Sequence, residues 1–476
     1  MGAGRTYRLA ILIPNVWGIR NIIHSGVLRS LNEAGVEVHL VMRHVPQYSH
    51  EMDGDYHDAC EIHPILIPQR VKRTPGKAFL DGVIYSAFMQ HNQIRSYPIY
   101  SRWFRRSETP RLRLRSNLIR SLGKTTQMPS IYYMMHRWSE SLYRRSVDLM
   151  PIRQHLRQIS PDLLWSTAYI TPDEHAYVMA AQDLGIPVLA SILSFDNLTS
   201  RTSYLQRFHH YTVWSEWMKQ QLVLFYTHVS PEQVTVTGTP QFDFHRRAEF
   251  CLTRQETLSI LGLEPNDRYF VYGASTRQLA PDEPLLVRWL AQRIAETKQL
   301  KNYKVVVRLH PLDDWSRWNL ETDGLDCLIL SGAWLTKPSA DGWAFITREE
   351  QVRLVSLLTH AEACINIAST IGLDAAVLDR PVIGIDFRDE PQAPAELLYS
   401  EYYTEHYLPL VESGAIRIAS NWGRLIDIMI EAVLFPDKYR ANRQQAVQRI
   451  CGTVDGRAST RVVATVLDLL AKSKEL

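Results

Sequence analysis

Cysteine is scarce in this chain, and its few cysteines form no recognisable pattern. They stand at residues 60, 251, 327, 364 and 451, far apart and odd in number, and none has a C-x-x-C or Cys/His zinc spacing. Long apolar runs are missing too: no stretch reaches the roughly 18 apolar residues of a membrane span, and the first residues lack a signal-peptide pattern. These absences predict a cytoplasmic protein with reduced thiols, neither exported nor integral to a membrane.

An excess of charge of either sign is also absent. The 53 Lys and Arg residues nearly balance the 50 Asp and Glu residues, which leaves a net charge of +3 in 476 residues. The molecule as a whole is therefore not built to bind nucleic acid, and any affinity for a polyanion or a membrane must be local. A hydrophobic content of 45% is ordinary for a globular protein, and the length predicts two domains.

Short β-branched runs alternate with longer amphipathic stretches in both halves, which is typical of parallel sheets covered by crossover helices. The predicted strands are residues 8–13, 36–42, 61–67, 162–166, 187–192, 211–214, 234–237, 269–272, 304–309, 363–367, 381–385 and 416–418. The predicted helices are residues 21–34, 174–184, 241–261, 283–297, 348–359, 370–378 and 422–433. We expect two doubly wound, Rossmann-like α/β domains, residues 1–245 and 246–476, divided shortly after Gly238 and Pro240.

One segment departs from this alternation. Residues 95–124, within an insertion near residues 70–150, contain nine Lys or Arg residues and one acid, Glu108. Cations mixed with aromatic residues suit an anionic membrane surface; a basic lip for a phosphorylated acceptor and a solvated insertion without a specific role are the alternatives. The aromatic residues are Tyr97, Tyr100, Trp103 and Phe104. The cations that we expect to contact membrane or acceptor are Arg102, Arg105, Arg106, Arg111 and Arg113.

The predicted strand at residues 304–309 runs directly into His310 and Pro311, at the edge where open α/β sheets bind ligands. An imidazole there could donate a hydrogen bond to a phosphate oxygen, or as an imidazolium neutralise charge on a departing nucleoside phosphate. Proline fixes the backbone after it. A His-Pro pair alone is common, so its place at the end of a strand is what makes His310 a candidate ligand contact.

A second window follows the predicted strand at residues 363–367. Ser369 or Thr370 can cap the next helix, and exposed N–H groups at such a helix start attract phosphate. Asp374 lies one turn further and could reach ribose hydroxyls. The alternative is that Ser369 only caps a crossover helix and that Asp374 only occupies its first turn.

In this order, the two windows resemble the C-terminal domain of GT-B glycosyltransferases, among them bacterial surface-polymer transferases such as CDP-glycerol glycerophosphotransferases and capsule sialyl- and Kdo-transferases. In that family, a strand ending in His-Pro and a later Ser/Thr pair hold the donor's phosphates. Residues 236–243 (VTGTPQFD) look like the family's interdomain Gly-x-Pro-x-x-Asp segment, and the resemblance covers about residues 160–390. The donor contacts that it implies are Ser275, Thr276, Arg277, His310, Pro311, Ser369, Thr370 and Asp374.

The base that deprotonates an acceptor hydroxyl is expected in the N-terminal domain, because in two-domain transferases that domain usually faces the donor. Asp196 follows the predicted strand at residues 187–192 in a polar turn, where an Asx-turn or cap role is the alternative. Glu174, flanked by Asp173 and His175, is a second candidate that also has a structural alternative.

Metal and cofactor signals are weak. Asp313 and Asp314 are adjacent acids in a predicted loop without further ligands, so we expect them to lie on a solvated surface and we expect no catalytic metal. The resulting hypothesis is a metal-independent GT-B transferase without a cofactor. It would move a sugar or polyol from a nucleotide-activated donor to a surface polysaccharide or a lipid-linked acceptor, at the inner face of the cell membrane.

Two other functions fit the same windows. A nucleotide-sugar 2-epimerase shares the fold but needs several acids around the sugar ring and no acceptor surface, so the basic insertion argues against it. A non-catalytic nucleotide-sugar binding protein would keep nucleotide affinity without transfer.

Overall fold

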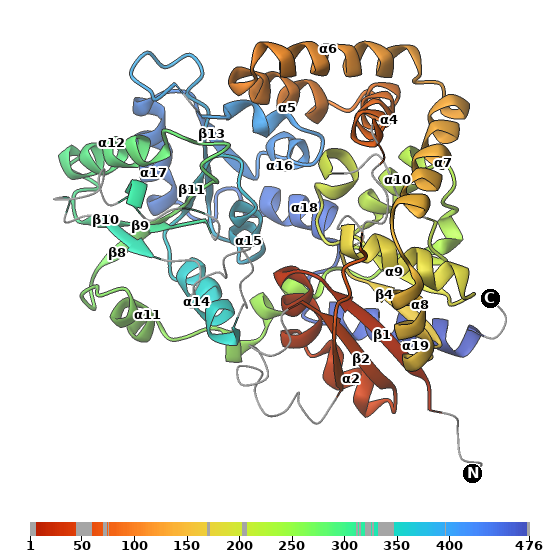
Figure 1. Ribbon diagram of the computed structural model, residues 1–476. Coiled ribbons are helices and arrows are strands. Elements are labelled where there is room, and N and C mark those ends of the chain that lie inside the picture. Colours follow the sequence, from red (N-terminus) through yellow and green to blue (C-terminus); the bar gives the residue numbers. More distant parts are fainter. Residues whose placement is uncertain are drawn as a thin grey trace. The chain divides into compact units, whose positions relative to one another are not determined.

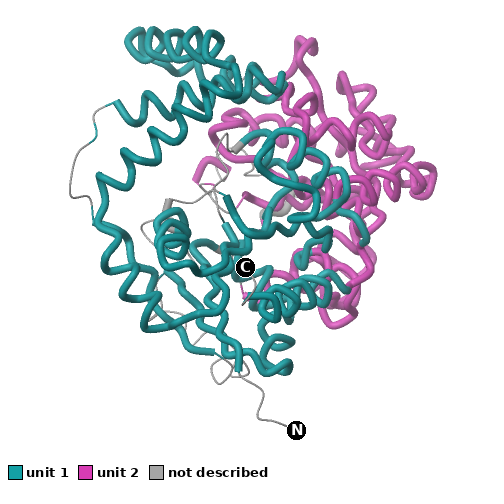
Figure 2. The backbone as a smooth tube through the Cα atoms, turned by 90° about the vertical axis from the view of Figure 1, so that its right-hand side faces the viewer, with its two compact units in different colours: residues 1–241, 451–453, 457–476 teal, residues 242–450, 454–456 magenta. Residues whose placement is uncertain are grey.

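The computed structural model forms two compact units (Figures 1 and 2). It describes residues 6–43, 60–69, 74, 76–168, 172–201, 207–310, 313, 316–318, 325, 328–331, 347–395 and 397–473. Unit 1 comprises Met1–Gln241, Cys451–Thr453 and Arg457–Leu476, and unit 2 comprises Phe242–Ile450 and Val454–Gly456. Each unit is built on a parallel sheet, which confirms the prediction of two doubly wound α/β domains.

In the residues described, unit 1 contains a seven-stranded parallel sheet in the order β3-β2-β1-β4-β5-β6-β7. Its strands are β1 (Arg8–Ile13), β2 (Glu37–Met42), β3 (Glu61–Pro64), β4 (Leu163–Ser166), β5 (Val188–Ser191), β6 (His210–Val213) and β7 (Val234–Val236). Every residue of β1 after Arg8 and of β2 after Glu37 is buried. Such continuous burial, with only His39 of these residues polar, is typical of strands covered on both faces.

The helices of unit 1 match the sequence only in part. They are α1 (Val16–Gly18), α2 (Val27–Glu33), α4 (Lys77–His91), α5 (Ser96–Phe104), α6 (Pro110–Thr125), α7 (Pro129–Ser146), α8 (Met150–Ile159), α9 (Pro172–Asp183), α10 (Glu216–Phe225) and α19 (Ala458–Lys472). The single helix predicted at residues 21–34 is wrong. A π-helical turn, Ile19–His24, comes first, and Gly26, with a φ of 92°, separates it from α2. Glycine permits this left-handed conformation at little steric cost.

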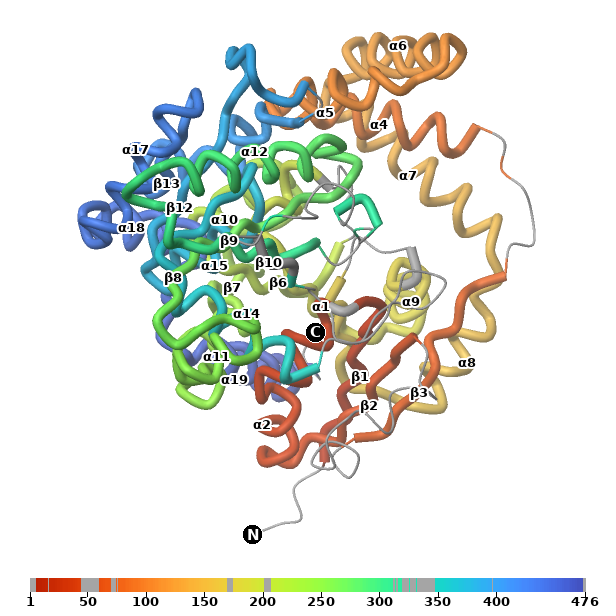
Figure 3. Tube along the Cα trace, turned by 90° about the vertical axis from the view of Figure 1, so that its left-hand side faces the viewer, coloured from red at the N-terminus to blue at the C-terminus, as the bar shows by residue number. Residues whose placement is uncertain are grey.

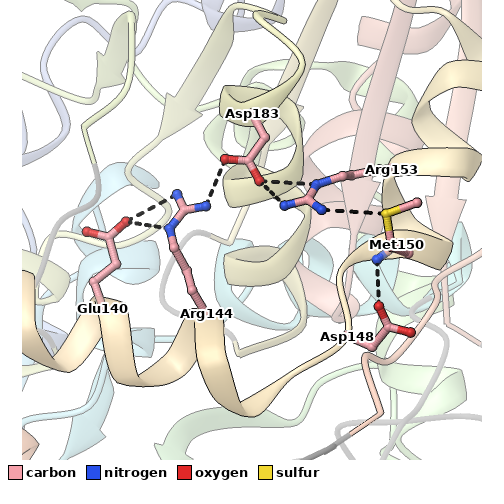
Figure 4. A network of polar contacts seen from close by, with 6 residues as sticks. All are labelled: Glu140, Arg144, Asp148, Met150, Arg153 and Asp183. Atoms are coloured by element: carbon pink, nitrogen blue, oxygen red, sulfur yellow. Dashed lines mark hydrogen bonds and ion pairs between the residues drawn. The ribbon is translucent and has the colours of Figure 1, made fainter.

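The basic insertion folds as helices α4 to α7, with α6 beside α4 and α5 (Figure 1). Gly123 of α6 lies so close to α4 that a Cβ atom there would come within 2.3 Å of the Ser86 hydroxyl. Figure 4 shows how the insertion is fixed to the sheet layer: the Asp183 carboxylate of α9 accepts hydrogen bonds from Arg144 of α7 (2.8 Å) and from Arg153 of α8 (2.5 Å). Burial raises the pKa of Asp183, but these two guanidinium groups outweigh burial and leave it below its usual value.

Within the part of the chain that the structure describes, unit 2 contains a six-stranded parallel sheet in the order β10-β9-β8-β11-β12-β13. Its strands are β8 (Arg268–Gly273), β9 (Tyr303–Arg308), β10 (Leu328–Ser331), β11 (Cys364–Asn366), β12 (Val382–Ile385) and β13 (Ile416–Ala419). All strands predicted in both halves are present, although β3 ends at Pro64 rather than at residue 67. The edge strand β10 was not predicted.

The helices of unit 2 include a correction at its start. They are α11 (Arg254–Ile260), α12 (Glu283–Glu296), α14 (Arg348–Thr359), α15 (Ile371–Val377), α16 (Leu408–Glu412), α17 (Trp422–Leu434) and α18 (Arg440–Cys451). The long helix predicted at residues 241–261 is wrong, because short 3₁₀ turns precede α11. Phe244 and Phe250, with ring centroids 4.7 Å apart, turn inward onto Val355, and the capping box of Thr253 and Glu256 starts α11.

The chain crosses between the units more than once. The first crossing lies between Gln241 and Phe242, close to residue 245, but α19 returns to unit 1. There the Ser459 hydroxyl donates to the Ser25 carbonyl (3.2 Å), and the Arg461 guanidinium donates to the Thr237 carbonyl (2.7 Å). None of the helices among the described residues is both long and apolar enough to cross a bilayer.

Candidate functional site

Three loops leave the carboxyl edge of the unit 2 sheet side by side, after β9, β8 and β11. These strands are neighbours, and their register pairs Gly273 of β8 with Arg308 of β9 and with Asn366 of β11. The loops that carry His310, Ser275 and Ser369 therefore start at the same level of the sheet. Since adjacent strands lie about 4.8 Å apart, the two outer loops begin about 10 Å from each other.

The buried side-chain amide of Asn366 stabilises the turn after β11. The Oδ1 atom of Asn366 accepts hydrogen bonds from the Ser369 N–H (3.0 Å) and from the Tyr407 hydroxyl (3.3 Å). Ala368 has a φ of 44°, a left-handed conformation that costs a non-glycine residue free energy and often occurs at functional sites. Thr370 is exposed, and its side chain makes no capping hydrogen bond to α15. The turn therefore presents the Thr370 hydroxyl to solvent, beside the half-buried Ser369.

The loop after β8 is organised by Glu283, which the sequence analysis did not single out. Its carboxylate is fully buried and accepts hydrogen bonds from the Ser275 N–H (3.1 and 2.9 Å) and from the Tyr272 hydroxyl (2.9 Å). Burial raises the pKa of Glu283 to about 8 against the opposing effect of these donors and of Arg317, 3.7 Å away. The available sequence signal was an acid at the first position of the helix that follows the loop.

The same loop places the other predicted donor contacts. Ser275 and Thr276 are half-buried, and Arg277 is exposed. The Thr276 carbonyl accepts hydrogen bonds from Leu279 and Ala280, which closes a turn. Arg277 is thus the most accessible cation of this loop, and Ser275 is fixed through its backbone.

His310 follows β9, and its environment favours the uncharged imidazole over the imidazolium. Burial lowers its pKa to about 4, although Asp313 acts in the opposite direction. At neutral pH the imidazole is uncharged, so it can donate a hydrogen bond to a ligand but does not bring a positive charge. Pro311 and Asp314 lie outside the described residues.

Asp313 does not lie on a solvated surface, as the sequence analysis expected. Its carboxylate is buried and accepts hydrogen bonds from Arg317 (2.6 Å) and from the Trp318 indole (2.8 Å). Trp318 is fully buried, so Asp313 lies against a buried aromatic side chain. Asp313 supports the loop that carries His310.

Asp374 of α15 is engaged within unit 2. Its Oδ1 atom lies 3.0 Å from the Nε2 atom of His245, and both side chains are largely buried. His245 comes from the segment that follows the predicted interdomain motif. The contact places Asp374 against that segment, although the Nε2 atom of His245 makes no hydrogen bond with the Asp374 carboxylate.

In unit 1, Asp196 lies in the turn after β5, at the start of a π-helical turn, Asn197–Arg201. One carboxylate oxygen accepts from the Ser200 hydroxyl (3.0 Å) and the other from the Asn197 amide (3.3 Å). The Asp196 carbonyl also accepts from the backbone N–H groups of Thr199 and Ser200. The residue is only half-buried, so the turn orients its carboxylate without enclosing it.

Glu174 has the geometry of a positioning residue. It is fully buried, and it accepts hydrogen bonds from the Ser166 hydroxyl and from the N–H groups of Thr167 (3.2 Å) and Ala168 (2.9 Å). Both oxygens are thus committed to the loop after β4. The side chain of Asp173 lies outside the described part.

His175, the residue after Glu174, also packs tightly against its neighbours. The ring of His175 stacks on Tyr143 with centroids 4.7 Å apart. Burial, followed by the charge of Lys77, lowers the pKa of His175 to about 4. This packing favours a structural role for His175.

A small cavity lies at the carboxyl ends of the last strands of unit 1. It measures about 30 Å³, and its lining includes Thr167, Ser191, Thr212 and Thr237, which lie at or just beyond the last residues of β4 to β7. The Ser191 hydroxyl accepts from the Trp165 indole (2.8 Å) and shares a hydrogen bond with Thr212 (2.7 Å). The volume suits about one water molecule rather than a sugar ring.

The basic insertion presents a mixed apolar and basic surface, mainly on α6. Leu114 and Leu118, one turn apart, are 72% and 50% exposed. These exposed leucines were not singled out from the sequence. Tyr97 is not an outward anchor, because its hydroxyl donates to Ser86 (2.6 Å). Arg102, Arg106, Arg111 and Arg113 are exposed, and Arg105 is half-buried.

The family model for CDP-Glycerol:Poly(glycerophosphate) glycerophosphotransferase matches residues 194–468. This range is more than half of the 476 residues, and it contains the turn of Asp196 and all three loops of unit 2. The chain belongs to this family. This glycerophosphotransferase family member is accordingly a transferase; Glu174 and the basic insertion lie before the matched range.

Solved structures with similar folds extend over nearly the whole family member. UDP-GlcNAc 2-epimerase from Neisseria meningitidis, bound to UDP-GlcNAc, has 13% identity and a TM-score of 0.56, with 97% of this chain and 100% of that chain covered. UDP-GlcNAc 2-epimerase from Methanocaldococcus jannaschii has 14% identity and a TM-score of 0.55, with 97% and 99% covered.

A glycosyltransferase is among these similar structures too. CalG4, the calicheamicin glycosyltransferase, has 11% identity and a TM-score of 0.51, with 98% of this chain and 99% of that chain covered. At such identities the similarity concerns the GT-B fold alone. A comparison with curated proteins found no match.

Proposed function

We propose that the protein transfers a sugar or a polyol phosphate from a nucleotide-activated donor to a surface polysaccharide or a lipid-linked acceptor. The observation that carries this proposal is the alignment of the three loops after β9, β8 and β11 at one edge of the unit 2 sheet. The family assignment points to activated glycerol as one donor, and the epimerase bound to UDP-GlcNAc points to a nucleotide sugar as another.

The three loops offer complementary groups to a nucleoside phosphate. His310 supplies a neutral N–H donor, Arg277 a cation, and Ser369 and Thr370 hydroxyls. A span of about 10 Å between the outer loops suits a diphosphate with part of its ribose. Preorganised donors of this kind stabilise charge that develops on a leaving phosphate without needing to reorganise during the reaction.

The acceptor base in this proposal is Asp196. Its carboxylate is oriented by Ser200 and Asn197 and remains half-exposed, whereas Glu174 is buried and fully hydrogen-bonded. A general base must reach the proton that it removes, so accessibility favours Asp196. The transfer in this scheme needs no metal ion.

We further propose that α5 and α6 hold the enzyme at an anionic membrane surface. On α6, Leu114 and Leu118 form an outward apolar stripe, with Arg111 and Arg113 exposed nearby. An amphipathic helix with apolar and cationic residues on its outer face binds at the lipid headgroup level, and each cation there contributes about 1 kcal/mol. This placement would bring a lipid-linked acceptor within reach.

Donor binding can be tested by thermal shift with CDP-glycerol and with UDP-, CMP- and GDP-sugars. A ligand that binds the folded state raises the melting temperature by mass action, so one nucleotide class should stand out. The selected donor is then incubated with candidate acceptors, with and without EDTA. Nucleotide release that requires the acceptor and resists EDTA supports the proposal. Epimerisation of the nucleotide sugar in the absence of an acceptor would instead identify an epimerase. Nucleotide binding without any turnover would identify a binding protein.

Membrane contact can be tested by vesicle sedimentation. The test variant carries Gln at Arg102, Arg105, Arg106, Arg111 and Arg113. The matched control carries Gln at five other exposed arginines, Arg157, Arg424, Arg440, Arg449 and Arg457. Wild type and control should bind anionic vesicles at low salt and detach as salt screens the surface over about 10 Å, and the test variant should remain in solution.

Two outcomes would contradict the membrane proposal. The wild type could ignore anionic vesicles at low salt, or the test variant could bind vesicles normally and lose activity on a phosphorylated acceptor. The second result would assign the arginines to an acceptor lip. Leu114→Ser with Leu118→Ser separates the apolar contribution, since it keeps every charge.

A further inference from the structure

Unit 1 carries a cluster of imidazole and carboxylate groups that the proposed transfer reaction does not use. His39 lies in β2, and Glu61 and His63 lie in the neighbouring edge strand β3 (Figure 3). The parallel register pairs His39 with Glu61 and Val41 with His63. Because side chains two residues apart on a strand share a face, all three functional groups emerge on the same side of the sheet.

Three potential ligand atoms of this cluster converge on one point. The Nδ1 atom of His39 lies 3.0 Å from the Nε2 atom of His63 and 3.3 Å from the Oε2 atom of Glu61, and the last two atoms are 3.6 Å apart. Zinc binds nitrogen and oxygen ligands at about 2.0–2.2 Å in tetrahedral geometry, which places ligand atoms about 3.3–3.5 Å from each other. The observed triangle has the size of one face of that tetrahedron.

The hydrogen bond on the far side of His39 sets its tautomer. Its Nε2 atom lies 3.0 Å from the Oε1 atom of Glu37, and a carboxylate can only accept, so Nε2 carries a proton. In the neutral ring, Nδ1 then presents a lone pair toward Glu61 and His63. A carboxylate that orients a ligating histidine in this way is the usual outer partner of a zinc site.

Among the described residues, His155 also lies near the cluster but is not one of the three converging ligands. The Tyr177 hydroxyl accepts a hydrogen bond from the Leu66 N–H (3.1 Å), and its oxygen lies 2.9 Å from the Nδ1 atom of His155, so this nitrogen is hydrogen-bonded outside the cluster. The rings of His63 and His155 meet edge to face, with centroids 5.3 Å apart. His155 thus packs against the cluster and supports His63.

We propose that His39, Glu61 and His63 bind a zinc ion, with Glu37 as the outer partner of His39. The Nδ1 atom of His39 and the Nε2 atom of His63 lie within hydrogen-bond distance; when His63 carries its proton on Nδ1 instead, three lone pairs face one point and a divalent cation satisfies them together. The His39 side chain is 5% exposed and that of Glu61 is 67% exposed, so water can complete the coordination from the open side. The ion would link the edge strand β3 to β2.

This zinc site would be structural. Glu61 begins β3 and His39 lies in the first half of β2, whereas ligands of open α/β sheets bind at the carboxyl ends of the strands. The ion would join two segments that are separated in sequence, and metal clips of this kind stabilise by closing a loop. Its removal should lower stability and leave the transfer chemistry intact.

The test uses the full chain without a polyhistidine tag, stripped with a chelator and dialysed against zinc. The variants are Glu61→Gln, His63→Gln and Glu37→Gln. His210→Gln is the matched control, because His210 is a half-buried histidine of the same sheet that hydrogen-bonds Thr235 (2.7 Å). Bound zinc is measured by elemental analysis, and cobalt is substituted to report a four-coordinate site through its visible absorption.

Wild type and His210→Gln should each retain one zinc ion per chain and melt at a higher temperature with zinc than without. Glu61→Gln and His63→Gln should lose stoichiometric zinc, and Glu37→Gln should bind it about 10–100-fold more weakly. Glu61 is the most exposed ligand, so its variant keeps the test valid if the histidine variants misfold. Absence of bound zinc in the wild type, or equal zinc in wild type and Glu61→Gln, would overturn the proposal.

Discussion

The carboxyl edges of the two sheets differ at the point where the strand order reverses. In unit 1 this point lies between β1 and β4, and the Thr167 hydroxyl closes it by donating to the Leu12 carbonyl (2.6 Å). In unit 2 it lies between β8 and β11, where the strained turn of Ala368 leaves Thr370 exposed. At each edge a buried glutamate accepts hydrogen bonds from the backbone N–H of the loop. This residue is Glu174 in unit 1 and Glu283 in unit 2.

A buried glutamate therefore stabilises both carboxyl edges, although one edge is closed and the other is exposed. In unit 1 the hydroxyls of Ser166, Thr167 and Ser191 bond to groups within the protein, whereas the turn of Asp196 offers a half-exposed carboxylate. Unit 2 turns polar groups toward solvent, as expected of a site that holds phosphates. A change in unit 1 should therefore affect acceptor chemistry, and a change in unit 2 should affect the donor.

The largest effect is expected for Asp196→Asn. The change keeps the size of the side chain but removes the basic oxygen, so transfer should fall by about 10³-fold or more, near the upper range for loss of a general base. Donor affinity, measured by calorimetry, should stay the same. Ser200→Ala is the control for the turn itself. Normal transfer by Asp196→Asn would show that the base is another group.

His310→Ala should lower turnover by about 100-fold, the cost of losing one preorganised donor to developing charge. Because burial lowers the pKa of His310 to about 4, its contribution should be constant between pH 6 and pH 8, and the ratio of wild-type to variant turnover measures this. A ratio that falls steeply across this range would mean that the imidazolium is the active form. His360→Ala, elsewhere in unit 2, is the control.

Glu283→Gln should change how stability depends on pH. The pKa of Glu283 is about 8 in the folded protein and 4.5 in an unperturbed glutamate. Between these values the folded state holds a proton that the unfolded chain releases. The contribution to the free energy of unfolding is therefore full below pH 4.5 and is lost as the pH rises to 8.

The size of this change is on the order of a few kcal/mol, since each unit of pKa shift corresponds to about 1.4 kcal/mol. Urea unfolding at several pH values would measure it. The Gln variant should lack this decline, and Glu296→Gln, exposed on the same helix, should keep it. Parallel curves for wild type and Glu283→Gln would show that Glu283 is ionised in the folded protein.

The smallest effect is expected for Ser369→Ala combined with Thr370→Val. Two hydrogen bonds from uncharged hydroxyls to phosphate are lost, each worth at least about 1 kcal/mol, so the dissociation constant of the nucleotide should rise about 30-fold. Calorimetry with the donor selected by thermal shift would measure it. Ser259→Ala, exposed on α11, is the control. Unchanged affinity would remove this turn from the donor site and weaken the contrast between the two edges.

The sequence predicted the sheets well, because buried parallel strands are written as short apolar runs such as residues 8–13 and 304–309. It also predicted which loops carry polar groups. It did not predict the break at Gly26, where a single left-handed glycine interrupts an otherwise helical pattern. The inward turn of Phe244 and Phe250 was missed for a similar reason, since packing onto Val355 overrides local propensity.

The contacts that shape the site were beyond sequence reasoning. Glu283 and Asp313 look like ordinary surface acids in the sequence, and only the fold shows that both are buried around Arg317. Conversely, nothing in the sequence singled out Leu114 and Leu118, and only the structure shows that they face solvent. Whether a side chain faces the core or the solvent depends on residues that are distant in the chain.

The return of α19 to unit 1 also fixes the order in which the protein can be completed during synthesis. Unit 2 is almost continuous, so it can fold as soon as residue 450 has left the ribosome. Unit 1 must wait for residues 458–472, whose side chains reach back to Ser25 and Thr237. Domains generally fold as units while the chain is made. The half that begins first is therefore completed last.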